Sequence, residues 1–348
     1  MTQPLNASRL ALNEMHVAAS ATFAERDGWW LPAHYGDPIA EYGAIRASAA
    51  VIDRSASSRL LVTGAGSSDL LVRVFGDIVG ELQEAEAIRA VALDDDGAVR
   101  DFTLVARTGA NAFLLMGEPG QRRETTDRLR EAISSDIDAR VDDRTETTCL
   151  VGLVGPEAAS VMSKYLSDGL ADRLPGMHCV AFEALGFRSL AIRISDTGED
   201  GFALMLAPGV ARHTIESVRA AGVPLAGQVA QTIARVEACI PAFSPDLEVG
   251  LTPAEADLAG LVSAGSGPVR RMLSALLMDG QGESTSGVPI TLGPMAVGEI
   301  RSSVRSPLLG STIALGVVEA HYSLPGTTLE VAGRPATVVT KPFYRRRN

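Results

Sequence analysis

The chain has 348 residues, of which 46% are hydrophobic and 21% charged, the composition of a folded protein large enough for more than one domain. Its formal net charge of −11 argues against a nucleic-acid partner, because such a partner requires a concentrated basic surface. No stretch approaches the roughly 20 uncharged apolar residues of a membrane helix, and Glu14 and His16 interrupt any signal peptide, so we expect a cytoplasmic protein without a membrane partner.

The first half of the chain predicts helices and strands in irregular order, without the regular alternation of a doubly wound sheet. The turn Gly64-Ala65-Gly66 resembles a dinucleotide fingerprint, but Asp69 stands where the third glycine belongs. We therefore predict a plain strand-to-helix turn in which Ser67 caps the helix. The expected elements are a helix over 37–49, a strand over 59–63, a helix opened by 64–69, strands near 90–93 and 99–107, a hairpin partner over 113–116 and a helix over 121–133.

The second half of the chain predicts a change of architecture toward its end. Residues 260–268 are rich in Gly and Ser and form the best candidate linker, and residues 271–345 are rich in strands and turns. This pattern predicts an α+β fold followed by a small antiparallel β-barrel. The elements expected before the linker are a strand over 149–154, a helix begun by 155–157, strands over 190–194 and 202–206, and helices over 214–221 and 226–237.

An acidic residue, Asp101, lies inside an otherwise alternating β pattern over residues 97–107. Period-2 alternation puts Asp101 and Thr103 on one face of the strand and Phe102 on the other. A mid-strand carboxylate indicates a face that is wet or that lines a ligand cavity. From the strand alone, an edge position that exposes Asp101 to water is the simpler explanation.

A second candidate is the acidic turn over residues 196–201, Asp-Thr-Gly-Glu-Asp-Gly, between two predicted strands. One interpretation is a hydrophilic β-turn, and the spacing alone favours it. The other is that the flanking glycines present Glu199 to a cavity. There a carboxylate can accept two parallel hydrogen bonds from an amidine-like ring edge, such as that of a pterin.

The metal-ligating residue types predict no metal site. The three cysteines are widely spaced and form no Cys-x-x-Cys pair, which suits buried thiols in a reducing compartment. The five histidines never pair at metal-ligand spacing, and the acidic run over 94–97 lacks the alternating ligands of a calcium loop. We expect that run to be a solvated hairpin turn.

Taken in chain order, several segments resemble the aminomethyltransferase family, that is, the glycine-cleavage T-protein and its folate-dependent relatives. Residues 97–107 resemble the family's Gly-Gly-Ile-x-Asp-Asp segment with Asp101 at the first Asp, and residues 197–202 resemble Thr-Gly-Glu-x-Gly-Phe. Residues 235–243 resemble Arg-Leu-Glu-Ala-Gly-Met-Pro-Leu-Tyr. The other family-like segments are residues 28–35, 41–46, 51–55, 252–256, 306–316 and 342–345.

The resemblance implies a cloverleaf of three subdomains around a central channel that holds tetrahydrofolate. It implies a folate-binding domain over residues 1–260, made of two interleaved α/β subdomains, and a barrel domain over 269–348. Asp101 is the implied catalytic residue, because a preorganised carboxylate near the folate nitrogens stabilises positive charge that develops as carbon is transferred. The implied cofactor-binding residues are Glu199 at the pterin edge, Phe243 as a stacking wall, Arg235, Asp196, Met116 and Glu118. For Arg235, an ion pair with Glu237 or another carboxylate is an equal alternative.

The chain also departs from the family. Ser55-Ala56-Ser57 replaces Ser-His-Met, Phe102 replaces the second Asp of the pair, and Asp196 replaces a Tyr. The segment after Thr-Pro-x-Glu-Ala is shortened to residues 260–268. These changes argue against a lipoyl carrier protein as partner and favour a small-molecule substrate. The candidates for a general acid, by position only, are Tyr35, Tyr42 and Asp196.

The resemblance therefore implies a tetrahydrofolate-dependent methyl transferase, or demethylase, that acts on a specialised small substrate. Three alternatives stay open. The chain could be a glycine-cleavage-type aminomethyltransferase, a relative that has lost folate and catalyses another reaction in a biosynthetic pathway, or a non-catalytic folate-binding accessory protein. The accessory proteins carry a Cys-containing motif after the Pro-x-Glu segment, and residues 254–266 contain no Cys.

Overall fold

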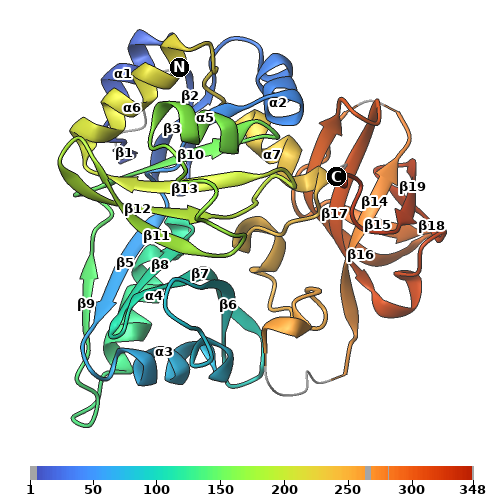
Figure 1. Ribbon diagram of the computed structural model, residues 1–348. Helices are drawn as coiled ribbons and strands as arrows, with labels where there is room; N and C mark the ends of the chain where they lie inside the picture. The colour runs from blue at the N-terminus through green and yellow to red at the C-terminus, as the bar shows by residue number, and fades with distance from the viewer. Residues whose placement is uncertain (1–5, 263–267, 281, 347–348) are drawn as a thin grey trace. The chain divides into compact units, whose positions relative to one another are not determined.

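A computed structural model describes residues 6–262, 268–280 and 282–346 of the chain (Figure 1). The chain divides into two compact units. The first unit comprises Met1–Ala90 and Thr103–Gln231, and the second comprises Val91–Phe102 and Thr232–Asn348. No helix in the described ranges is both long and apolar enough to cross a membrane.

A five-stranded antiparallel sheet in the order β11-β12-β13-β10-β4 forms the centre of the first unit (Figure 1). Apolar residues of α1, α5 and α6 pack on this sheet in one buried cluster that includes Met15, Met162 and Ile215. The elements are β4 (Ala50–Asp53), β10 (Cys149–Val154), β11 (Cys179–Ala184), β12 (Phe187–Arg193), β13 (Gly201–Leu206), α1 (Asn13–Ala18), α5 (Ala158–Tyr165) and α6 (Pro208–Ala220).

A second five-stranded sheet has the order β6-β7-β8-β5-β9. A buried cluster joins Leu104, Leu114 and Met116 of this sheet to Leu150 and Ile192 of the first sheet, so the two sheets share a core. The strands are β5 (Ser58–Thr63), β6 (Ala87–Leu93), β7 (Val99–Gly109), β8 (Ala112–Gly117) and β9 (Arg140–Asp143), and the helices next to them in sequence are α3 (Ser67–Phe75) and α4 (Arg122–Glu131).

The remaining elements before the barrel are short. Strands β1 (Ser8–Arg9), β3 (Trp29–His34) and β2 (Thr22–Arg26) form a small sheet in that order. Helix α2 (Pro38–Ala47) begins after Asp37, whose Oδ1 accepts hydrogen bonds from the backbone N–H groups of Ile39 and Ala40, as an N-cap does. Helix α7 (Gln228–Glu237) and a helical segment over Phe243–Leu247 lead toward the barrel.

The second unit contains a closed antiparallel barrel in the order β14-β17-β16-β15-β18-β19. Its core is apolar and includes Leu276, Ile300 and Val318, each fully buried. This confirms the predicted C-terminal β-barrel, whereas residues 263–267 of the predicted linker lie outside the described ranges. The strands are β14 (Arg271–Met278), β15 (Pro289–Leu292), β16 (Met295–Ser306), β17 (Ser311–Glu319), β18 (Thr328–Val331) and β19 (Arg334–Val339).

The predicted helix cap at Ser67 is wrong. Gly66 is the residue before α3, and among the described residues no side chain caps the helix. A Cβ on Gly66 would lie 2.8 Å from the backbone nitrogen of Asp138, so this turn packs tightly against another backbone segment. The close approach explains why a glycine occupies the position that a capping side chain would need.

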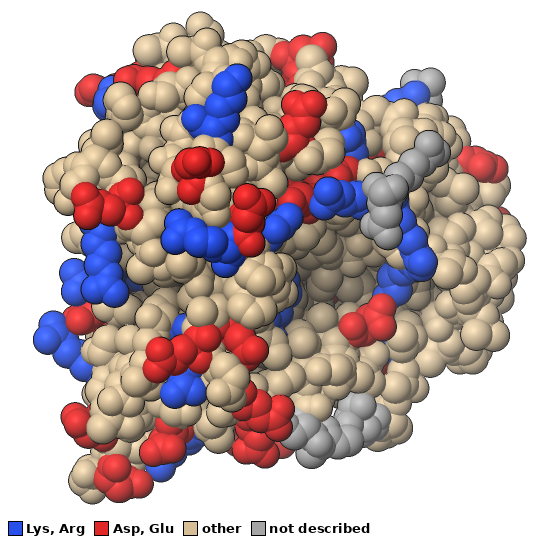
Figure 2. Space-filling view, viewed as in Figure 1, with Lys and Arg blue, Asp and Glu red and all other residues tan. Residues whose placement is uncertain are grey.

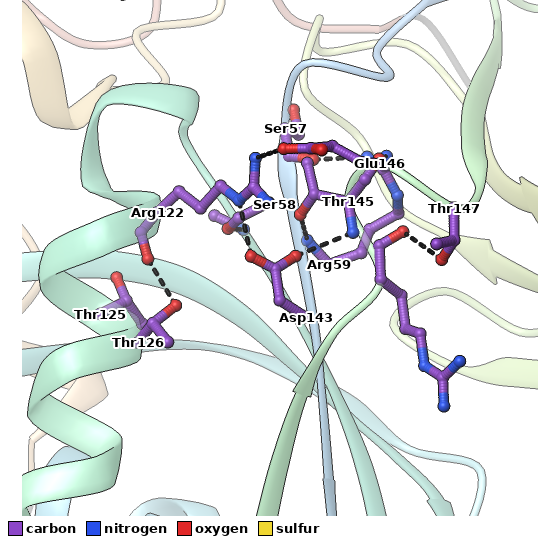
Figure 3. Close-up of polar contacts among 12 residues, drawn as sticks. Ser57, Ser58, Arg59, Arg122, Thr125, Thr126, Asp143, Thr145, Glu146 and Thr147 are labelled. Carbon is purple, nitrogen blue, oxygen red and sulfur yellow. Dashed lines mark hydrogen bonds and ion pairs between the residues drawn. The ribbon is translucent and has the colours of Figure 1, made fainter. Parts of the chain in front are cut away.

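The buried guanidinium of Arg59 joins two turns of the first unit (Figure 3). Its Nε donates to Thr148 Oγ1 at 2.9 Å, and its two terminal nitrogens donate to the carbonyls of Ser57, Ser55, Thr145 and Thr148. All these acceptors are neutral, and burial lowers the pKa of Arg59 to about 10, which still leaves a cation near neutral pH. Arg59 is therefore the buried side chain that ties the turn over residues 144–148 to residues 55–57.

We expect Arg59→Met to lower the free energy of unfolding by about 3 kcal/mol or more, because several buried carbonyl oxygens lose their donor at once. Urea denaturation followed by circular dichroism measures this loss. Arg123→Met is the matched control, since the Arg123 side chain is 94% exposed, and it should change the value by at most about 0.5 kcal/mol. Equal effects of the two substitutions would contradict a central role for Arg59.

Candidate functional site

The loop between β12 and β13 carries the acidic turn found in the sequence. Gly198 has a φ of +83°, which a glycine adopts without strain. At Gly201 an added Cβ would lie 2.6 Å from the carbonyl oxygen of Ile194, so the loop closes tightly on itself. Arg193 donates to both oxygens of Asp200, from Nε at 2.9 Å and from Nη2 at 2.5 Å. This bidentate pair fixes the end of the loop.

Glu199 is buried inside this loop, with 2% of its surface exposed, so the hydrophilic-turn interpretation is wrong for this residue. Arg46 of α2 lies against it, with Arg46 Nη1 3.7 Å from Glu199 Oε1. The same Nη1 donates to the carbonyl of Thr197 at 2.7 Å, and the Arg46 guanidinium lies over the Tyr42 ring. Helix α2 thus holds the loop, and the Glu199 carboxylate is an acceptor in a largely dry environment.

Asp196, at the start of the loop, forms ion pairs with both Arg54 and Arg89. Burial would raise the pKa of Asp196, but the two guanidinium groups outweigh it and hold the pKa well below its usual range. A carboxyl group held ionised in this way has no proton to donate near neutral pH. Asp196 is therefore wrong as a candidate general acid, and the arrangement gives it a structural role between two arginines.

Two other predicted cofactor residues lie at the end of β8. Met116 is 8% exposed and belongs to the core cluster shared by the two five-stranded sheets. Glu118 is half-buried and directly precedes a short helical turn that begins at Pro119. The structure therefore shows packing for Met116, and the folate contacts of both residues stay predictions.

Asp101 lies in the second unit and is fully buried, so the edge position facing water is wrong. Residues on both sides of it in the strand, Val99 and Phe102, are also buried. Only Arg100 is exposed in this stretch, and its Nε donates to Asp94 in the preceding turn at 2.8 Å. A carboxylate removed from water at this position is suited to stabilise a positive charge that develops beside it.

Arg235 forms an ion pair within the second unit. Its Nη1 lies 2.6 Å from Asp246 Oδ2 and also donates to the carbonyl of Ile240, and its Nη2 donates to Ser302 Oγ at 2.9 Å. This arrangement is the alternative interpretation of Arg235, with Asp246 in place of Glu237 as the partner. Phe243, 7% exposed, begins the segment that carries Asp246. The contacts of Arg235 and Phe243 with folate stay predictions.

Three arginines that sequence reasoning did not select, Arg46, Arg54 and Arg89, determine the charge around the loop. Each comes from a different part of the chain, and no local pattern distinguishes them from surface arginines. In Figure 2, acidic and basic side chains are interspersed over the face in view. Within the described ranges, no three His, Cys, Asp or Glu side chains gather as a metal site requires.

Comparison with known proteins finds a family match for each of the two parts of the chain. The family model described as the GCVT N-terminal domain matches residues 12–265, and the model described as the glycine cleavage T-protein C-terminal barrel domain matches residues 270–345. A protein named aminomethyltransferase from Streptomyces avermitilis is 29% identical over 364 residues, covering 97% of each chain. One of the same name from Geobacillus kaustophilus is 27% identical, covering 97% of this chain and 99% of its own.

A solved structure shows the same fold. The glycine cleavage system aminomethyltransferase T from Bartonella henselae aligns with a TM-score of 0.88 at 23% identity and covers 98% of this chain and 99% of its own. This likeness confirms the predicted α+β fold with its C-terminal barrel.

We expect Asp196→Asn to lower the free energy of unfolding by about 2 kcal/mol at neutral pH, because two arginines lose their shared partner. Since the folded-state pKa of Asp196 is lowered, its contribution is complete above the unfolded pKa of about 3.9 and is lost as pH falls through the folded-state value. The difference between wild type and variant should therefore shrink at about pH 3 and below. Urea denaturation at several pH values measures it.

Asp127→Asn is the control for this series, because the ion pair of Asp127 with Arg123 is exposed. It should cost at most about 0.5 kcal/mol at any pH. A difference for Asp196→Asn that stays constant from neutral to acidic pH would contradict the lowered pKa.

Proposed function

Because this chain belongs to the glycine cleavage T-protein family, we propose that it is a folate-dependent aminomethyltransferase. The observation that carries the proposal is the pair of family matches over residues 12–265 and 270–345, which together span both the predicted folate domain and the barrel. The names of the relatives favour the glycine-cleavage-type alternative over a specialised demethylase.

The buried carboxylates offer hydrogen-bond acceptors that suit the N–H groups of tetrahydrofolate. Glu199 and Asp101 are 2% and 0% exposed, and a buried carboxylate is a suitable acceptor for the N–H groups of an aminopyrimidine ring. When bound, tetrahydrofolate supplies the nucleophilic nitrogen that accepts the one-carbon unit. Glu199 would hold it at the polar ring edge, and the stacking contact of Phe243 with a ring face stays a prediction.

In this proposal, Glu199, Asp101 and Asp196 have three different roles. Glu199, with Arg46 at its side, orients the pterin edge through hydrogen bonds. Asp101 stabilises the positive charge that develops on the transferred carbon and its nitrogen, since an unsolvated carboxylate interacts with such a charge more strongly than it would in water. Asp196 keeps Arg54 and Arg89 in place and takes no part in proton transfer.

The identity of the one-carbon donor is proposed separately, from the residues that depart from the family pattern. Ser55-Ala56-Ser57, Phe102 and Asp196 depart from the family pattern. Asp196 holds two arginines where the family has a neutral Tyr, which changes the charge of this loop. We propose that the donor is a small aminomethyl compound and not an aminomethyl group on a lipoyl carrier protein.

Asp101→Asn should lower kcat at least about 100-fold and leave the dissociation constant for tetrahydrofolate within about threefold, because the loss falls on the transition state. Glu199→Gln should weaken tetrahydrofolate binding about tenfold or more, because the substitution replaces a charged acceptor. Isothermal titration calorimetry and single-turnover kinetics separate the two effects. Glu216→Gln, an exposed position on α6, is the control. Full activity of Asp101→Asn would rule out the catalytic role of Asp101.

The identity of the donor can be tested with two substrates that carry the same aminomethyl group on sulfur. One is the free aminomethyl dihydrolipoamide, and the other is the same group on a lipoyl carrier protein. With tetrahydrofolate present, we expect kcat/KM for the protein-bound donor to be no higher than for the free compound. A kcat/KM that is at least about tenfold higher for the carrier would show a docking surface worth about 1.4 kcal/mol and overturn the small-donor proposal.

A further inference from the structure

The first unit contains a groove of about 550 Å³ that no step of the proposed function uses. Its walls come from the ends of β3, α2 and α6 and from the segment after α6. The polar residues in it are Tyr35, Asp37, Glu41 and Arg219, and the apolar ones include Val223 and Leu225. A volume of this size accommodates a small molecule.

The Tyr35 side chain begins a buried chain of hydrogen bonds, the relay, which runs through His16 to Asp53. The Tyr35 hydroxyl lies 2.8 Å from His16 Nδ1, and His16 Nε2 lies 2.8 Å from Asp53 Oδ2. His16 is fully buried and Asp53 is 5% exposed. The other oxygen of Asp53 accepts a hydrogen bond from the backbone N–H of Ser55 at 2.8 Å. Tyr35 is therefore the only member of the relay that lines the groove.

The relay determines which way the Tyr35 hydroxyl points. Burial would raise the pKa of Asp53, but hydrogen bonds from His16 and Ser55 outweigh it, so Asp53 stays ionised and accepts the Nε2 proton of His16. In a neutral imidazole the other nitrogen, Nδ1, is then an acceptor. With His16 neutral, Tyr35 donates its proton to Nδ1 and keeps the lone pairs of its oxygen for a ligand. The groove thus offers an acceptor at this point.

Tyr35 is not suited to act as a base. Burial and the nearby carboxylates of Asp53 and Glu41 raise its pKa above the ordinary value for tyrosine, so the phenol stays neutral. Its role in the groove is to bind a donor group, and the relay fixes its orientation. This separates the arrangement from a catalytic triad, in which the relay serves to activate a nucleophile.

Charged groups at the two sides of the groove have opposite signs. The Glu41 carboxylate accepts from the backbone N–H groups of Tyr35 at 2.5 Å and Gly227 at 2.8 Å, and it has further lone pairs. Asp37 adds a second carboxylate, at the N-cap of α2. Arg219, near the end of α6, is exposed and forms no ion pair with any residue in the described ranges.

We propose that this groove binds a small molecule with an ammonium group and a carboxylate, the chemistry of an amino acid. The ammonium group donates to the Tyr35 oxygen and is attracted by Glu41 and Asp37, and the carboxylate pairs with Arg219. A ligand with only one of these groups satisfies one side of the groove and leaves the other without a partner. The inference does not depend on folate or on the transferase activity.

The experiment is a calorimetric titration of the full chain with three probes, namely glycine, methylammonium and acetate, at fixed ionic strength. Glycine should bind at least about tenfold more tightly than either single-charge probe, because it makes both polar contacts. Tyr35→Phe and Arg219→Gln should each weaken glycine binding about fivefold to tenfold, and Arg212→Gln, on the same helix but outside the groove, should leave it unchanged.

Thermal unfolding of each variant without ligand shows whether it is folded. Arg219→Gln removes an exposed side chain that forms no ion pair with the described residues, so it tests binding even if Tyr35→Phe lowers stability. No binding of glycine by the wild type, equal affinity for the three probes, or full affinity in both groove variants would each overturn the proposal. Loss of transferase activity with glycine binding retained would contradict the proposed function alone.

Discussion

Three carboxylates of the loop between β12 and β13 pair with arginines, and this constraint determines the position of the loop. Asp196 pairs with Arg54 and Arg89, Glu199 with Arg46, and Asp200 with Arg193. Only Arg193 is close in sequence. An ionised group without a partner is costly when buried, so the loop can take this form only where α2, β6 and the segment after β4 bring their arginines to it.

The same constraint relates the fold to the proposed chemistry. A carboxylate whose surroundings are fixed before the ligand arrives does not need to reorganise when it binds or when charge develops. The short glycine-containing turns around Gly198 and Gly201 keep the loop compact, and the arginines keep its acidic side chains in place. Preorganisation here is a property of long-range ion pairs and not of the turn itself.

The sequence predicted the elements well where the signal was local. The strand over 149–154 agrees with β10 in both bounds, and the strands near 99–107 and 202–206 agree with β7 and β13 to within a few residues. The barrel followed from its turn-rich composition. The helix expected from residue 214 begins earlier, at Pro208, because the pattern of apolar residues in its first turn is weak.

The sequence failed where a property depends on distant parts of the chain. The strand alone favours an edge position exposed to water for Asp101, whereas the residues on both faces of the strand around it are buried. Asp196 is a candidate general acid by position only, and the sequence does not show its pairing with Arg54 and Arg89, because neither arginine is near it in sequence. For Arg235, the alternative of an ion pair with a carboxylate other than Glu237 is confirmed, but which carboxylate it is depends on the helical segment over Phe243–Leu247, which returns the chain toward α7 and brings Asp246 to Arg235.

The central claim is that this chain binds tetrahydrofolate through Glu199. Hydrogen–deuterium exchange with and without tetrahydrofolate tests it most directly, because ligand binding slows exchange in the segments that contact the ligand. The account predicts slower exchange in residues 195–202, with little change in the barrel strands β18 and β19. Unchanged exchange in residues 195–202 at saturating tetrahydrofolate would contradict it.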